Sequence, residues 1–165
     1  MQNVTVLVAA FAGLGAVSGI RHIEAKKTAF SYARELVSDK GMINLGAGPH
    51  RTLLAGEIAN APEVVANVDI ALDGLPNFTQ LDIETDCLPF ADNEFDCAFM
   101  SHILEHLGDW EYALTEAVRV ADHVVVVLPH PLSIASWLNR QHKQHFSLRD
   151  MRAIEETYPT VTVFC

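Results

Sequence analysis

Short apolar runs alternate with segments of helical periodicity along most of the chain. The apolar runs predict strands at 42–45, 64–69, 79–82, 95–100, 123–128 and 160–164. Apolar residues three and four positions apart predict helices at 22–39, 51–59, 110–120 and 148–157. Ser147 is a suitable N-cap for the last helix. Strands that alternate with helices indicate the α/β class, with a doubly wound and mostly parallel sheet.

The N-terminal segment differs from the rest because the 17 residues Val4–Ile20 carry no charge. A helix of this length spans about 25 Å, close to the thickness of a bilayer's hydrocarbon core. Arg21, Lys26 and Lys27 follow it, so the positive-inside rule predicts a single-pass transmembrane helix with the C-terminal domain in the cytoplasm. A buried helix and a cleaved signal peptide are alternatives, although the positive start of a signal peptide is missing.

These patterns divide the chain into a transmembrane anchor at 1–21, a linking helix at 22–40 and an α/β domain at 41–165. Within the apolar segment, Gly15 and Gly19 have the GxxxG spacing that lets membrane helices approach closely. We therefore expect contact with the membrane through residues 4–20, and a homo-oligomer or a larger membrane complex is a further expectation.

Acidic residues outnumber basic ones by 21 to 11, which gives a formal net charge of −10. This balance argues against nucleic acid as a partner, because proteins that track phosphates rely on basic surfaces. The excess is concentrated in residues 52–118, which contain 14 acids and neither Lys nor Arg. Cys87, Cys97 and Cys165 have no CxxC spacing and predict neither a disulfide framework nor a zinc knuckle.

A glycine pair follows the strand predicted at 42–45. Gly46 and Gly48 stand where the strand turns toward a helix, a place where a backbone can come close to a ligand. Asp69 ends the next strand, where an open α/β sheet presents a carboxylate to ribose hydroxyls. Arg51 replaces the third glycine of a dinucleotide fingerprint, so an NAD-dependent oxidoreductase is the weaker alternative. An adenosine ligand with a positive sulfonium centre suits the acidic region better.

Four segments in order resemble motifs of the class I S-adenosylmethionine-dependent methyltransferases, and most closely their type 11 branch. They are INLGAGPH at 43–50, NVDI at 67–70, LPFADNEFD at 88–96 and SHILEHL at 101–107. The resemblance covers residues 41–165. It implies a Rossmann-like methyltransferase fold, S-adenosyl-L-methionine as cofactor, and a small-molecule, lipid or glycan acceptor.

The resemblance also implies a set of cofactor-binding residues: Gly46, Ala47, Gly48, Asp69, Ile70, Asp82, Ile83, Ser101 and His102. The glycine turn would pass beneath the methionine moiety. Asp69 would bind the ribose hydroxyls, and Ile70 would pack on adenine. Ser101 and His102 would face the methionine end of the cofactor and the acceptor.

Several positions depart from the family pattern. Asn44 stands where an acid is usual, and His50 replaces a common third glycine. Before the fifth strand the usual turn is shortened to Ala121 and Asp122, and the seventh, antiparallel strand is expected to be absent. These departures leave an alternative open, a non-catalytic methyltransferase-like subunit of a membrane assembly.

Histidines provide the candidates for acid–base and metal chemistry. His102 and His106 are four residues apart and would share one face of a helix, as zinc ligands do. Glu105 and His106 are therefore metal candidates, although a packing and capping role is the favoured interpretation and the prediction is no metal. His102, His106 and His130 are candidate catalytic residues, because a neutral imidazole can take a proton from a hydroxyl acceptor.

A second polar cluster follows the strand predicted at 123–128. It contains His130, Trp137, His142, Lys143 and His145. Open α/β sheets bind substrates beyond the carboxyl ends of their strands, so this segment is a candidate acceptor site. A surface loop is the alternative interpretation.

Overall fold

The computed structural model describes residues 18–48, 53–71 and 74–165. Six parallel strands form one sheet in the order β3-β2-β1-β4-β5-β6. The strands are β1 Met42–Leu45, β2 Val64–Asp69, β3 Phe78–Gln80, β4 Phe95–Ser101, β5 Ala121–Val127 and β6 Val161–Phe164. The helices are α1 Ser18–Leu36, α2 Leu53–Ala59, α3 Trp110–Val120, α4 Ile134–Leu138 and α5 Leu148–Thr157, with a short 3₁₀ turn, η1, at Leu104–His106.

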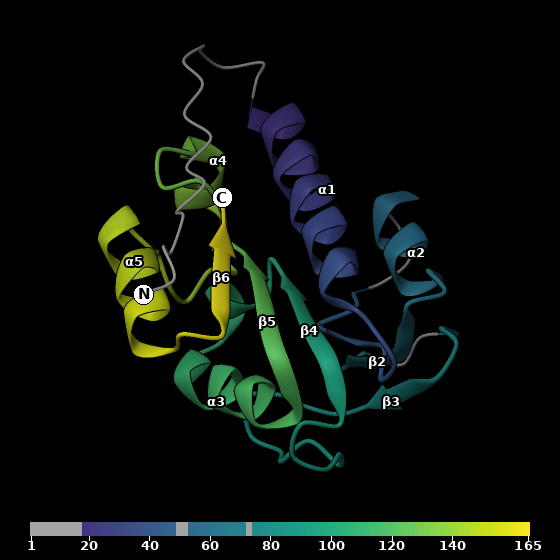
Figure 1. The fold of residues 1–165 in the computed structure, drawn as a ribbon. Helices are drawn as coiled ribbons and strands as arrows, with labels where there is room; N and C mark the ends of the chain where they lie inside the picture. The colour runs from purple at the N-terminus through teal and green to yellow at the C-terminus, as the bar shows by residue number, and fades with distance from the viewer. Residues whose placement is uncertain (1–17, 49–52, 72–73) are drawn as a thin grey trace.

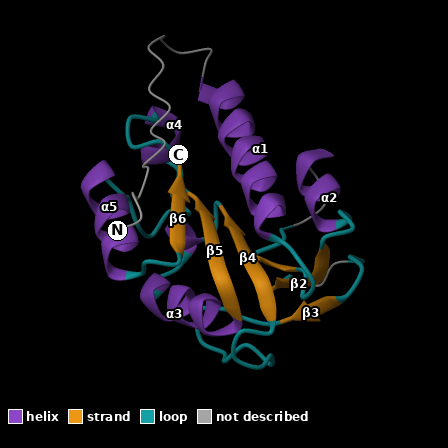
Figure 2. Cartoon of the chain, in the orientation of Figure 1, coloured by secondary structure: helices purple, strands orange, loops and turns teal. Residues whose placement is uncertain are grey.

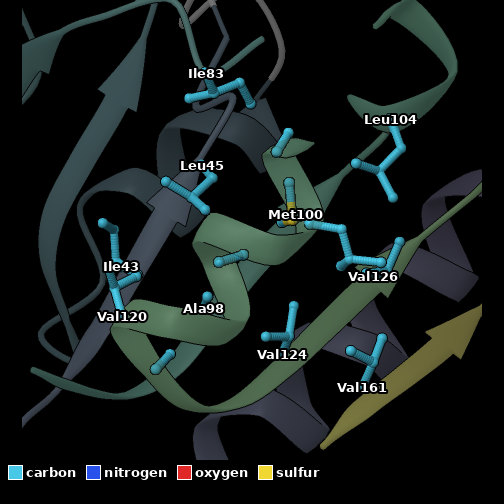
Figure 3. Packing of buried hydrophobic residues seen from close by; sticks show 14 of the residues in the cluster. Ile43, Leu45, Ile83, Ala98, Met100, Leu104, Val120, Val124, Val126 and Val161 are labelled. Atoms are coloured by element: carbon cyan, nitrogen blue, oxygen red, sulfur yellow. The ribbon is translucent and has the colours of Figure 1, made fainter. Parts of the chain in front are cut away.

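Successive residues of the central strands point into two different cores, as the period of a strand requires. On one face Ile43, Ala98 and Val124 pack with residues of α3 and α5 (Figure 3). On the other face Met42 and Val125 belong to a second core with residues of α1 and α2. The sheet is therefore a central layer between helices (Figure 2).

Helix α1 is a packed layer of this domain. Ala29 and Ala33 are completely buried, and the ring of Phe30 meets Phe99 of β4 edge-on at 5.4 Å between centroids. The link predicted at 22–40 thus covers one face of the sheet. Its first turn lies at the end of the sheet where the strands finish, and it runs back toward the start of β1 (Figure 1).

The predicted transmembrane segment, Val4–Ile20, falls almost entirely outside the described residues. Among the residues that are described, no helix is long and apolar enough to cross a membrane.

The α/β class and the parallel sheet predicted from the sequence are confirmed. Within the described residues β6 pairs directly with β5, and no antiparallel strand lies between them. The cysteines Cys87, Cys97 and Cys165 are free, in agreement with their spacing. Helix α4 and turn η1 were not predicted, because both are shorter than the window over which helical periodicity can be recognised.

A buried carboxylate joins α1 to the sheet at the start of β4. Asp96 Oδ2 accepts the backbone N–H groups of Ser38 at 2.8 Å, Lys40 at 2.8 Å and Gly41 at 3.1 Å. Its Oδ1 accepts the Ser38 hydroxyl at 3.0 Å. Burial alone would raise the pKa of Asp96, but these hydrogen bonds favour the charged form and hold the pKa below its usual value.

Replacing Asp96 should destabilise the protein. For Asp96→Ala we expect the free energy of unfolding at pH 7 to fall by about 3 kcal/mol, because several partly buried N–H groups lose their acceptor. Asp96→Asn, which keeps one oxygen, should lose about 1 kcal/mol. Denaturant unfolding followed by circular dichroism measures both values.

The stability difference between wild type and Asp96→Ala should depend on pH. Because the folded pKa of Asp96 lies below its unfolded value, its stabilisation is present above pH 4 and is lost as the pH falls through the folded pKa. The difference in free energy of unfolding between wild type and Asp96→Ala should become smaller as the pH falls through this acidic range. A gap that is constant from pH 7 to the acid transition would contradict the assignment.

Candidate active site

The turn after β1 has a backbone conformation that glycine favours and that lets the backbone come close to a ligand. Gly46 and Gly48 both have φ of +70°, a conformation that other residues rarely adopt. A Cβ atom on Gly46 would lie 2.6 Å from the side chain of Ile103, whereas one on Gly48 would be in ordinary contact, 3.9 Å from the carbonyl oxygen of Gly46. The N–H groups of Gly46 and Ala47 donate to the carbonyl oxygen of Val68 in β2, at 2.9 and 3.1 Å.

Asp69 at the end of β2 fixes the same turn. One carboxylate oxygen accepts the N–H of Gly48 and the other accepts the N–H of Ala71, both at 2.8 Å. Each carboxylate oxygen can accept a second hydrogen bond, so capacity remains for ligand hydroxyls. Ile70 is 63% exposed, which suits a side chain expected to pack against a flat ring.

Asn44, which stands where the family usually has an acid, is engaged inside the sheet. Its amide donates to Asn67 Oδ1 at 2.9 Å, and Asn67 in turn donates to the carbonyl oxygens of Ala59 and Pro76, each at 3.0 Å. This buried pair ties β1 and β2 to the connections on either side of them. In the structure Asn44 therefore joins two interior strands, β1 and β2.

Of the two residues predicted to lie at the edge of the adenine, Asp82 is in a loop and Ile83 is in the hydrophobic core. Asp82 Oδ1 accepts the N–H of Glu84 at 3.0 Å, which stabilises the turn after β3. Ile83 is only 7% exposed and belongs to the core shared with α3. Cofactor contact by Asp82 and Ile83 stays a prediction.

The end of β4 has an unusual backbone. His102 has φ of +55°, which is rare for a residue with a side chain and often marks a functional site. Its Nδ1 lies 3.3 Å from Glu105 Oε1. Just before it, the buried Ser101 hydroxyl has no hydrogen-bond partner among the described residues.

His102 and His106 do not share a helix face, contrary to the spacing argument. The segment forms only the single 3₁₀ turn η1, and His102 precedes it in a left-handed conformation. His106 instead turns toward the segment after α4, where its Nδ1 lies 3.1 Å from the carbonyl oxygen of Gln141. Its ring meets the ring of His142 edge-on, with 4.8 Å between centroids.

A cavity of about 140 Å³ lies beside this turn, beyond the ends of β4 and β5. Its apolar lining comes from Pro129, Pro131, Trp137 and Phe146, and its polar lining includes Glu105, His130 and His145. Trp137 stacks on His145 with the rings 4° from parallel and 4.6 Å apart. Three residues of the second polar cluster of the sequence, His130, Trp137 and His145, therefore line a cavity.

The protonation of two histidines, His130 in the cavity wall and His142 in the segment after α4, follows from their surroundings. His130 Nδ1 accepts the N–H of Leu132 at 3.2 Å, so a neutral His130 carries its proton on Nε2 and is better placed to donate than to accept. Burial is the main cause that lowers the pKa of His142, and the nearby histidines His106, His145 and His102 lower it further. The negative charge of Glu105 acts in the opposite direction. His142 is thus held neutral.

Comparisons with known proteins agree with this geometry. A family model described as a methyltransferase domain matches residues 43–124. The fold is similar to a SAM-dependent methyltransferase from Archaeoglobus fulgidus, with 19% identity, 83% of this chain and 68% of that chain covered, and a TM-score of 0.62. It is also similar to the YcgJ protein from Bacillus subtilis, with 23% identity, the same coverage of 83% and 68%, and a TM-score of 0.60. No curated protein matches the chain.

The match to a methyltransferase domain and the shared fold support the class I S-adenosylmethionine-dependent methyltransferase family, whose cofactor is S-adenosyl-L-methionine. The residues present fit this cofactor. Gly48 has the positive φ that a glycine adopts without strain, Asp69 keeps acceptor capacity, and Ile70 is exposed. His50 and Arg51, two departures noted in the sequence, lie outside the described residues.

Removing the Asp69 carboxylate should weaken cofactor binding. For Asp69→Ala we expect the affinity for S-adenosylmethionine to fall roughly 10- to 100-fold, because a charged acceptor contributes about 1.5–3 kcal/mol to each hydrogen bond. Calorimetric titration measures the affinity, and Glu57→Ala, which removes an exposed acid from α2, is the matched control. Equal affinities for the two variants would show that Asp69 does not contact the cofactor.

Proposed function

We propose that this protein is a membrane-anchored methyltransferase that acts on a lipid or another largely apolar small acceptor at the bilayer surface. The observation that carries this proposal is the cavity at the carboxyl edge of the sheet. The surface of its walls is mainly apolar and is interrupted by polar groups, the composition typical of sites for small apolar ligands.

Exposed apolar side chains beside the cavity support the location. Leu132, Trp137 and Leu138, on α4 and the turn before it, are 83%, 62% and 75% exposed. Helix α4 lies at the end of the sheet where α1 also begins (Figure 1). An anchor ahead of Ser18 would hold this edge near the membrane, where exposed apolar and aromatic side chains are favoured.

The chemistry asks little of the protein beyond position and exclusion of water. Bound S-adenosylmethionine supplies an electrophilic methyl group attached to a positive sulfur. Asp69 and the glycine turn would hold its ribose and methionine parts. The cavity wall formed by Trp137 and Phe146 would enclose the acceptor, and His130 Nε2–H would donate a hydrogen bond to it.

A non-catalytic subunit remains the second candidate. The observation in its favour is β6, an edge strand that pairs only with β5 within the described part of the chain. An unpaired strand edge is a surface on which a partner can add a strand. Calorimetry separates the two: saturable binding of S-adenosylmethionine supports the enzyme, and no heat at millimolar ligand supports the subunit.

The anchor can be tested with one substitution at the middle of the apolar segment. The full chain should sediment with membranes and be released by detergent but not by high salt. Ala12→Arg places a charge at the centre of the bilayer at a cost of about 3 kcal/mol and should shift protein into the soluble fraction. The matched variant Ala12→Leu should stay with the membrane, and equal release of both variants would contradict the anchor.

The acceptor class can be tested with labelled S-adenosylmethionine. The detergent-purified chain, incubated with a membrane lipid extract, should transfer label to a product that partitions into organic solvent. Asp69→Ala should reduce this transfer together with cofactor affinity. Label found only in water-soluble acceptors from a cell extract would overturn the proposed acceptor class while leaving the methyltransferase intact.

A further inference from the structure

Three side chains next to the cavity converge although they come from separate segments. Glu105 and His106 belong to η1, and His142 lies in the segment after α4. One ligand atom from each of the three lies within 4.8 Å of the others. Two imidazoles and one carboxylate form a donor set typical of zinc sites that keep a position open for a substrate or water.

Glu105 supplies a second, independent observation. Its side chain is only 2% exposed, although a carboxylate is costly to bury without partners. One oxygen lies near His102, and the other, Oε2, is buried with no hydrogen-bond partner among the described residues. A buried carboxylate oxygen without a donor is the group that a cation would satisfy.

Hydrogen bonds orient both imidazoles as metal ligands. His106 Nδ1 lies 3.1 Å from the carbonyl oxygen of Gln141, which can only accept, so the proton is on Nδ1 and the lone pair is on Nε2. His142 Nδ1 lies 3.1 Å from Ser136 Oγ, a hydroxyl oxygen that can accept a hydrogen bond from Nδ1–H and so leave the lone pair on Nε2. Partners of this kind hold the ligating histidines of metal proteins in place.

The two segments are also fastened to each other through their backbones. The carbonyl oxygen of Glu105 accepts the N–H groups of Lys143 at 2.8 Å and Gln144 at 3.1 Å. On the outside, Lys143 Nζ pairs with Glu84 Oε2 at 2.9 Å. The turn and the segment after α4 therefore hold the three side chains together before any ion binds.

We propose that Glu105, His106 and His142 form a binding site for a divalent transition metal, with Zn²⁺ as the best match. Ligand atoms around a tetrahedral zinc are separated by about 3.3 Å, which follows from bond lengths near 2.0 Å. The ligand atoms, which lie within 4.8 Å of one another, must therefore approach by up to about 1.5 Å, a movement within the reach of χ rotations.

Glu105 also lines the cavity, so an ion at this site would border the bound acceptor. This part of the inference rests on the proposed function. A divalent ion with an open position would bind an acceptor oxygen and stabilise its deprotonated form. The ion would then supply the activation that His130, with its proton on Nε2, is poorly placed to give.

Metal binding itself is tested without cofactor or acceptor. The detergent-purified full chain, stripped with a chelator, is titrated with Zn²⁺ in competition with a chromophoric chelator. We expect one equivalent to bind. Glu105→Gln, His106→Asn and His142→Asn should each weaken binding by at least about 100-fold, because each removes a ligand, a larger loss than that of an outer partner.

His123→Asn is the matched control, because His123 is an exposed histidine near the start of β5, at the opposite end of the sheet. Its affinity for Zn²⁺ should equal that of wild type. Thermal unfolding without metal identifies any variant that fails to fold, and Co²⁺ absorption reports ligand loss in the folded ones. No stoichiometric binding, or equal binding by His142→Asn and His123→Asn, would overturn the site.

The outcomes separate this inference from the proposed function. If Zn²⁺ binds but no labelled methyl group is transferred to the lipid extract, the metal site is supported and the proposed acceptor class is wrong. Transfer that proceeds unchanged in His142→Asn, with no metal bound to wild type, would retain the methyltransferase and remove the metal site.

Discussion

A parallel sheet that is packed on both faces can bind ligands only beyond the ends of its strands. Helices α1 and α2 contribute to one core and α3 and α5 to the other, so neither face is open. Since all paired strands run in the same direction, their carboxyl ends meet along one edge. The glycine turn follows β1, Asp69 ends β2, His102 follows β4, and the cavity begins after β5. The position of every candidate residue follows from this constraint.

The acidity of residues 52–118 has a structural cause that composition did not reveal. Several of these acids accept backbone N–H groups of the connections between strands. Asp69 holds the glycine turn, Asp96 holds the end of α1, and Glu84 accepts the N–H of Gly108 at 2.8 Å. Glu116 accepts hydrogen bonds from Arg119 and from the backbone N–H of Leu88. These bonds, chiefly the one from Arg119, lower the pKa of Glu116 to about 2, although burial alone would raise it. The basic side chains that pair with these acids lie outside residues 52–118. The negative charge of this region therefore reflects the hydrogen bonds that hold its loops at least as much as the ligand that the site binds.

The fold could be predicted from the sequence because its elements are long enough to show their periodicity. The helices at 110–120 and 148–157 and the strand at 64–69 were predicted with the bounds that the structure has, and Ser147 caps its helix as expected. The glycine turn and Asp69 could be predicted because the site is formed by neighbouring strand ends. The role of Asn44 could not, because its partner, Asn67, is 23 residues away and faces it only once β1 and β2 pair in register.

The histidine cluster shows where prediction from spacing fails. His102 and His106 have the separation of ligands on a helix, yet the chain forms a single 3₁₀ turn there, and the partner of His106 is His142, 36 positions further along the chain. A spacing argument considers only local geometry, whereas this contact depends on how α4 and the segment after it return across the sheet edge. The same return places Trp137 and His145 against the cavity and leaves Leu132 and Leu138 exposed beside it. This one segment therefore contributes to the cavity, to the proposed metal ligands through His142, and to the apolar surface at the edge where α1 begins. A change in its path would affect all three together, because the sheet fixes only where the strands end and this connection fixes which side chains meet there.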